Sequence, residues 1–196
     1  MTPISIDKRT SIKITNAPVD KDLSFLADLP DPVPGFKIGD TRQKLKALGE
    51  GKMIRVVAIA LVARKGSRES CNCGLAKATD TDNHIVLVDP ETENPSLADD
   101  EPDSQTAEFS PRVRLTRPKL AGAEIQKLIT DTPDHALLVR VTGVLMFDSE
   151  HSLGRHLKRH NDWEIHPVFG LEYCPDDKRC TASSDVNWVN MENKSQ

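Results

Sequence analysis

Histidine and carboxylate side chains stand near the ends of several apolar segments of this chain. They lie far apart in the sequence, but neighbouring strands of one sheet can bring such residues together. Imidazole nitrogen and carboxylate oxygen are ligands of zinc and of similar divalent metals. One interpretation is a catalytic site with a divalent metal as cofactor; the other, which the notable frequency of structural histidines favours, is that each histidine makes a local hydrogen bond at a strand end. The predicted catalytic residues are His84, Glu108, Asp148, His151 and His166, and the predicted metal ligands are His84, His151 and His166.

Asp148 and Glu150 accompany His151 at the exit of an apolar segment. A carboxylate beside an imidazole orients the ring and fixes its tautomer. Such a pair is typical of a general base in metal-assisted hydrolysis. The alternative is a simple turn, because Asp and Ser are common turn and cap residues.

Two short segments concentrate cationic side chains. Together they have enough charge to neutralise several phosphates of a nucleic acid. The aromatic content of 4% leaves few rings for base stacking, so the alternative is a solvated surface of paired arginines. The predicted nucleic-acid or anion-binding residues are Arg112, Arg114, Arg117, Arg155, Lys158 and Arg159.

The overall charge is mildly acidic, at −4, so no basic domain indicates nucleic-acid binding by the whole chain. No apolar run is long enough for a membrane span, which predicts no membrane partner. The N-terminal residues lack the apolar core of a signal peptide, so we expect a cytoplasmic protein.

The four cysteines form two close pairs, Cys71 with Cys73 and Cys174 with Cys180. Neither spacing matches the common zinc motifs. We therefore expect free thiols rather than a zinc site built from these four residues.

Apolar patterning and turn residues predict the order helix, strand, strand, strand, helix, strand, strand. Five strands with a helix between the third and fourth are typical of the oligonucleotide/oligosaccharide-binding (OB) barrel, a mainly β Greek-key fold, although a small α+β sheet is the alternative. We expect an extended or disordered arm over 1–40, the barrel domain over 41–173 and a polar tail over 174–196. The expected elements are 41–48, Met53–Ala63, His84–Asp89, Ala107–Val113, Leu120–Ile129, Leu137–Phe147 and Trp163–Tyr173.

Three local features refine this expectation. In the last strand, alternation places Trp163 and Ile165 in the core and Glu164 with His166 on the outer face. Gly143 predicts a bulge or bend in the strand before it. The acidic stretch 90–106 predicts a mobile loop. In the second helix the candidate buried residues are Leu120, Ala123, Ile125, Leu128 and Ile129.

Several of these segments together resemble a family of largely uncharacterised bacterial proteins that share a Trp-Glu-Ile-His-Pro-Val motif. The resemblance implies no activity, but it indicates that the matching polar residues form one shared constellation. The matching segments are Glu69-Ser-Cys-Asn-Cys73, Asp82-Asn-His-Ile85, Glu108-x-x-Pro111-Arg112, Val141-Thr-Gly-Val-Leu-Met-Phe-Asp148 with His151, and Trp163-Glu-Ile-His-Pro-Val168.

A weaker likeness connects Ile85-Val-Leu-Val-Asp-Pro-Glu91 to the strand and turn that carry the metal-binding carboxylates of thermonuclease-like barrels. Those enzymes have an arginine where His84 stands, and their second catalytic arginine has no clear match here.

These observations predict a binding module for an anionic ligand, with single-stranded nucleic acid as the expected partner. One alternative is a metal-dependent phosphodiesterase or nuclease built on the histidines and carboxylates. Another is a protein-interaction or assembly subunit that uses the N-terminal arm or the acidic stretch to contact a protein partner.

Overall fold

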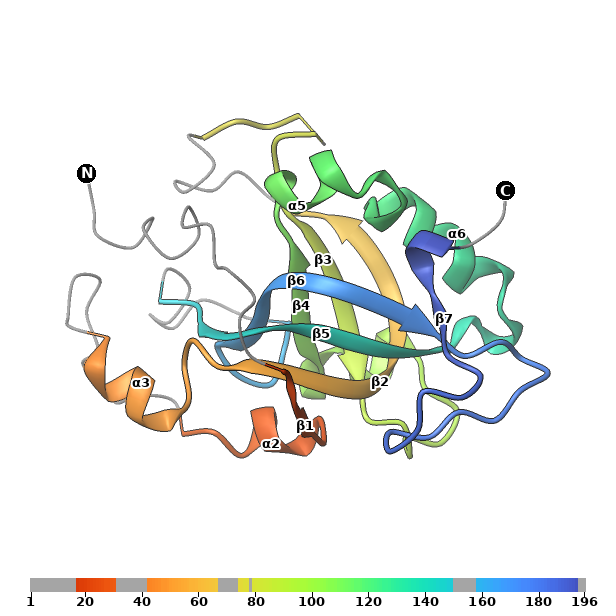
Figure 1. Cartoon of the computed structure of the whole chain (residues 1–196), viewed down its shortest axis with the longest axis horizontal. Helices are drawn as coiled ribbons and strands as arrows, with labels where there is room; N and C mark the ends of the chain where they lie inside the picture. Colours follow the sequence, from red (N-terminus) through yellow and green to blue (C-terminus); the bar gives the residue numbers. More distant parts are fainter. Residues whose placement is uncertain (1–16, 31–41, 67–73, 78, 150–157, 194–196) are drawn as a thin grey trace.

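Five strands close into a barrel in the computed structural model (Figure 1). The strands are hydrogen-bonded in the order β2-β3-β4-β6-β5, and β5 pairs again with β2. This confirms the predicted mainly β, OB-like Greek-key barrel. The barrel strands are β2 (Met53–Lys65), β3 (Asn83–Val88), β4 (Gln105–Phe109), β5 (Leu137–Phe147) and β6 (Trp163–Tyr173). The structure describes residues 17–30, 42–66, 74–77, 79–149 and 158–193.

Side-chain alternation along β6 places large apolar groups inside the barrel. Trp163 and Ile165 are fully buried in the main core, as predicted. The Trp163 ring packs edge-on against Phe147 of β5, with ring centroids 5.3 Å apart. Because side chains alternate, Glu164 and His166 must lie on the opposite, outer face of the same strand.

Gly143 marks an irregularity in the pairing of β5 with β6, as predicted. A Cβ atom there would lie 2.5 Å from a side-chain carbon of Ile165 and 2.8 Å from the carbonyl oxygen of Pro167. Only a residue without a side chain allows this approach of the two strands.

Helix α6 (Gly122–Asp131) lies between β4 and β5, the third and fourth barrel strands. It buries Ile125, Leu128 and Ile129, as predicted, whereas Ala123 is exposed, contrary to prediction. The side-chain oxygen of Gln126 accepts a hydrogen bond from the backbone of Ala63 at 2.8 Å, which ties the helix to β2. Among the described residues, no helix has the length and apolar character that crossing a membrane requires.

The segment after β4 differs from prediction. The third strand ends at Phe109, because Pro111 begins a helix, α5 (Pro111–Thr116), in place of the predicted strand to Val113.

The acidic stretch before β4, predicted to be a mobile loop, forms two helical turns, α4 (Leu97–Asp100) and η1 (Glu101–Asp103). The Ser96 side chain caps α4 by accepting a hydrogen bond from the backbone of Asp99.

The described part of the N-terminal segment packs against the barrel. Strand β1 (Val19–Lys21) pairs in parallel with β2, and helix α2 (Ser24–Ala27) buries Leu26 in the core. Two hydrogen bonds reach this segment from the start of β6: the Asn161 side chain donates to the Leu26 carbonyl, and the Trp163 indole donates to the Pro30 carbonyl. Helix α3 (Gln43–Leu48) follows and ends at Gly49, whose φ of 115° is in the left-handed region.

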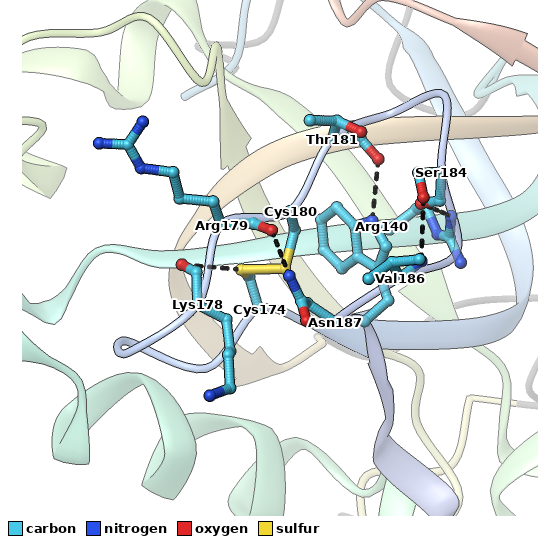
Figure 2. Close-up of a disulfide and its surroundings, with 10 residues drawn as sticks. Arg140, Cys174, Lys178, Arg179, Cys180, Thr181, Ser184, Val186 and Asn187 are labelled. Carbon is cyan, nitrogen blue, oxygen red and sulfur yellow. Dashed lines mark hydrogen bonds between the residues drawn. A yellow bond between two sulfur atoms is a disulfide. The ribbon is translucent and has the colours of Figure 1, made fainter.

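A disulfide joins Cys174 to Cys180 just after β6 (Figure 2), so the prediction of free thiols is wrong for this pair. Cys71 and Cys73 lie outside the described residues. The tail then returns to the barrel through β7 (Val189–Asn190), which pairs with β6, and through the 3-10 turn η4 (Met191–Asn193). Disulfides persist chiefly in oxidising compartments. The bond therefore bears on the predicted cytoplasmic location, which stays a prediction.

Candidate metal centre and anion cavity

Strand register assembles the site on the outer face of the barrel. Arg64 of β2 stands opposite His84 of β3, and His84 stands opposite Glu108 of β4. The parallel pairing of β4 with β6 joins Thr106 to Glu164. Two residues further along both strands, the same register brings Glu108 beside His166. One row across four strands therefore carries four ionisable side chains.

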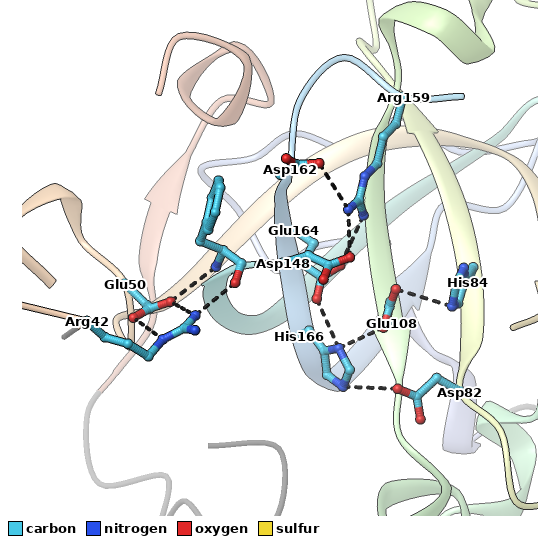
Figure 3. A network of polar contacts seen from close by, with 11 residues as sticks. Arg42, Glu50, Asp82, His84, Glu108, Asp148, Arg159, Asp162, Glu164 and His166 are labelled. Atoms are coloured by element: carbon cyan, nitrogen blue, oxygen red, sulfur yellow. Dashed lines mark hydrogen bonds and ion pairs between the residues drawn. The ribbon is translucent and has the colours of Figure 1, made fainter. Parts of the chain in front are cut away.

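Glu108 connects two histidines within this row (Figure 3). One carboxylate oxygen, Oε1, lies 3.2 Å from Nε2 of His84, and the other, Oε2, lies 2.7 Å from Nδ1 of His166. Glu108 and His166 are buried, whereas the His84 side chain is 24% exposed. The carboxylate thus lies between a buried imidazole and one near the surface.

His166 is surrounded by further carboxylates. Its Nδ1 lies 3.1 Å from Glu164 Oε1, and its Nε2 lies 3.4 Å from Asp82 Oδ2. One ligand atom each from Asp82, Glu108 and His166 lies within 4.8 Å of the other two. This nitrogen and these oxygens are the donor set that Mn²⁺, Fe²⁺ or Zn²⁺ takes in proteins, so the residues fit such an ion.

The predicted metal ligands are only partly brought together. His166 belongs to the group, His84 is attached to it through Glu108, and His151 lies outside the described residues. Asp82 was not among the predicted site residues, because its segment has the composition of a turn. The segment Asp82-Asn-His-Ile85 of the resemblance was the available signal.

Arg159 enters the same network from the segment before β6. Its guanidinium lies 2.8 Å from Asp148, 3.0 Å from Glu164 and 3.7 Å from Asp162. Burial opposes its charged form, but the carboxylates of Glu164, Asp148 and Glu108 outweigh burial and raise the pKa of Arg159. Arg159 is a predicted anion ligand, and in the structure its guanidinium already has carboxylate partners.

Asp148 is held in place by an ion pair behind it. Arg42 and Glu50 form an ion pair with each other. Both also hydrogen-bond to the backbone of Phe147: the Arg42 guanidinium donates to the Phe147 carbonyl at 2.8 Å, and the Glu50 carboxylate accepts from the Phe147 N–H at 3.3 Å. Sequence analysis missed both residues. No motif signals them, since they act through the backbone next to Asp148.

The buried network has an excess of negative charge. Arg114 approaches Asp82, whose charge opposes the effect of burial, although burial prevails and lowers the pKa of Arg114. Counted over the described residues alone, with Arg114 and Arg159 as cations and both histidines neutral, five carboxylates give a formal charge of minus three. A buried excess of this kind is costly without a counter-ion. The five carboxylates are those of Asp82, Glu108, Asp148, Asp162 and Glu164.

A cavity of about 130 Å³ opens beside the network. Its wall includes Glu108 and Asp148 together with four side chains that are cationic or can become so. Gly66 borders His84 closely, since a Cβ atom there would lie 2.7 Å from Nε2 of the imidazole. Those four side chains are Arg64, His84, Lys158 and Arg159.

The first predicted basic cluster lies on α5 and just after it, not on a strand. Arg112 is exposed. Arg114 donates to the Thr81 carbonyl, and Arg117 donates to the Phe169 carbonyl and lies 3.5 Å from Glu192. Arg114 and Arg117 are therefore engaged within the protein. Of the second cluster, Arg155 lies outside the described residues and Lys158 is exposed.

The site therefore combines a buried His-carboxylate group with a small cavity whose wall has both charges. It lies at the start of β3, the end of β4 and the start of β6, beside the described residues 148–149 and 158–162 between β5 and β6, a connection that corresponds to one of the loops that bind ligands in OB barrels. Comparison of the chain with protein-family models, with curated proteins and with solved structures found no match.

Proposed function

We propose that this protein is a divalent-metal-dependent phosphodiesterase of the nuclease class. The metal is held by Asp82, Glu108 and His166, and a phosphate of the substrate binds in the adjoining cavity. The observation that carries the proposal is the position of Glu108, whose two oxygens face His166 in the buried group and His84 at the cavity.

The charge of the buried network supports a metal ion in particular. A divalent cation at Asp82, Glu108 and His166 offsets two of the three negative charges by which the buried carboxylates exceed Arg114 and Arg159 among the described residues. Protonation of both histidines supplies the same two charges, which is the metal-free alternative. Metal content therefore distinguishes the two states directly.

The proposed reaction adds the oxygen of a water molecule to phosphorus and breaks one phosphorus–oxygen ester bond. The departing alkoxide leaves as an alcohol after it takes up a proton. The proton lost by the water goes to His84, which lines the cavity and which Glu108 orients. A bound metal ion stabilises the negative charge that develops on the phosphate oxygens.

The first experiment measures metal binding and cleavage in the same preparations. Purified full-length protein is treated with EDTA and titrated calorimetrically with Mn²⁺, Zn²⁺ and Mg²⁺, and labelled single-stranded DNA and RNA are then added. We expect one metal per chain and metal-dependent cleavage. Glu108→Gln on β4, which preserves shape, removes both, whereas Glu172→Gln on β6, the strand of His166, preserves both. Absence of metal binding by the wild-type protein would sink the proposal.

A binding module without turnover is the second candidate, favoured by the cationic side chains at the cavity wall and by their place beside the β5–β6 segment. It predicts oligonucleotide binding that weakens steeply with salt while the oligonucleotide stays intact. The same labelled strands, followed by fluorescence anisotropy at several salt concentrations, separate this candidate from an enzyme. An assembly role stays a prediction, which gel filtration tests.

A further inference from the structure

The cavity beside Glu108 is small, and its described wall offers no aromatic surface for a base. Its volume is about 130 Å³, and among the described residues its wall contains no aromatic ring. The two side chains of the wall that are not ionisable are Val86 and Thr106. Proteins that hold single-stranded nucleic acid through its bases normally stack them on aromatic rings. This wall instead suits contact with a phosphate group alone.

The cationic groups of this wall are largely balanced by neighbouring carboxylates. Arg64 is paired with Glu101, and Arg159 is paired with Asp148 and Glu164. Lys158 is exposed, and no ion pair joins it to another described residue. Glu108 adds a further negative charge to the wall. Without a metal ion, the cavity therefore attracts an anion only weakly.

A metal ion at the buried group changes this balance, because Glu108 belongs to both places. A divalent cation bound by Glu108 together with Asp82 and His166 would add two positive charges beside the cavity wall, which Glu108 also lines. The electrostatic interaction is strong there because the group is buried. The charge around the wall then shifts by two units in the positive direction, which favours the binding of an anion.

We infer that the cavity binds the phosphate group of its substrate, without reading the base, only after the metal ion is bound. This inference rests on the proposed function, since it requires the metal at Asp82, Glu108 and His166. Metal and phosphate are then positively coupled ligands. By linkage, the phosphate raises the metal affinity by the same factor as the metal raises the phosphate affinity.

The test uses methylphosphonate, a phosphate-like dianion without an ester bond, and adenosine 5′-monophosphate. Each is titrated by calorimetry into metal-loaded and EDTA-treated protein. We expect methylphosphonate to bind at least about tenfold more tightly to the metal-loaded form, within the usual range of coupling between sites. Adenosine adds less than about threefold to that affinity, because no ring of the wall stacks on it.

Two variants locate the coupling. Lys158→Ala weakens methylphosphonate binding and leaves the metal affinity unchanged, whereas Lys127→Ala, on the exposed face of α6, changes neither affinity. Equal methylphosphonate affinity with and without metal overturns the inference while the proposed metal site stands. A tenfold contribution from adenosine overturns the absence of base recognition. If no metal binds, the proposed function fails first, so the two failures are distinguishable.

Discussion

Two arginines on the outer face of the barrel are surrounded by carboxylates, yet their surroundings differ. Arg140 of β5 forms an ion pair at 2.6 Å with Glu172, its cross-strand neighbour on β6, and another at 2.8 Å with Asp185 of the tail. Its guanidinium also lies over the Trp188 ring. Its hydrogen bond with Glu172 raises the pKa of Arg140. Glu172 and Asp185 are 24% and 83% exposed, so water shares in their solvation. This cluster is close to charge balance and attaches the tail.

The Arg159 cluster also has an arginine at its centre, but its partner carboxylates have almost no contact with water. Its three partners, Asp148, Asp162 and Glu164, have side chains no more than 8% exposed, and Asp82 and Glu108 lie just beyond them. Charged groups held this far from water must be compensated from within the protein. The comparison shows that the two clusters differ in the burial of the carboxylates around the arginine, rather than in the presence of an ion pair.

The largest expected effect is that of Arg159→Met, which removes the guanidinium from among three buried carboxylates. We expect a loss of about 3–5 kcal/mol in the free energy of unfolding, as when one partner of a buried ion pair is removed. Urea denaturation measures it. Lys158→Met, one residue away and exposed, is the control and should stay within about 0.5 kcal/mol. A loss below about 1 kcal/mol for Arg159→Met would show that the buried charge is not what distinguishes this cluster.

Metal binding should stabilise the folded protein through the Arg159 side of the barrel, and the Arg140 cluster should not contribute to the gain. At a free metal concentration of one hundred times Kd, the wild type gains about 2.7 kcal/mol. For a chain of this length the gain raises Tm by several degrees, at roughly 2–4 °C per kcal/mol. Differential scanning calorimetry with and without metal measures the rise. Glu108→Gln abolishes it and Glu172→Gln does not; an equal rise in both variants would place the metal elsewhere.

Removal of the disulfide should lower the stability of the protein without changing the metal site near Arg159. Cys174→Ser opens the small loop to Cys180, and we expect a loss of about 2 kcal/mol in unfolding free energy. Metal affinity should be unchanged, because Cys174 follows the end of β6 while Glu164 and His166 stand near its start. Calorimetric metal titration of the variant checks this, with Cys180→Ser as the matched control. A weaker metal affinity in both variants would contradict the separation of the two regions.

The smallest effect is expected for Arg140→Met. Its partners are partly exposed and regain water, so we expect a loss of about 1–2 kcal/mol, including the contact with the Trp188 ring. Urea denaturation in parallel with Arg159→Met gives the comparison. If the two variants lose equal stability, the exposure of the partner carboxylates does not set the cost.

The features that sequence patterns predicted are those encoded within a few neighbouring residues. Alternation placed Trp163 in the core, and Gly143 marked the bulge in β5. The failures arose where a local pattern has two meanings. Arg159 belongs to a segment with the composition of a solvated surface, and Asp82 to one with that of a turn. Neither pattern contains the distant carboxylates and strands that decide their burial.

By itself, the sequence determined the order of the strands, the place of helix α6 and the two faces of β6, because the period of side chains along a strand is a local property. Only the tertiary structure decided that His84, Glu108 and His166 share one row and that Arg159 lies among carboxylates. Those contacts depend on the register between strands that are distant in the sequence. The register is set by the closure of the whole barrel, since β4 meets β6 only when the chain between them has folded back.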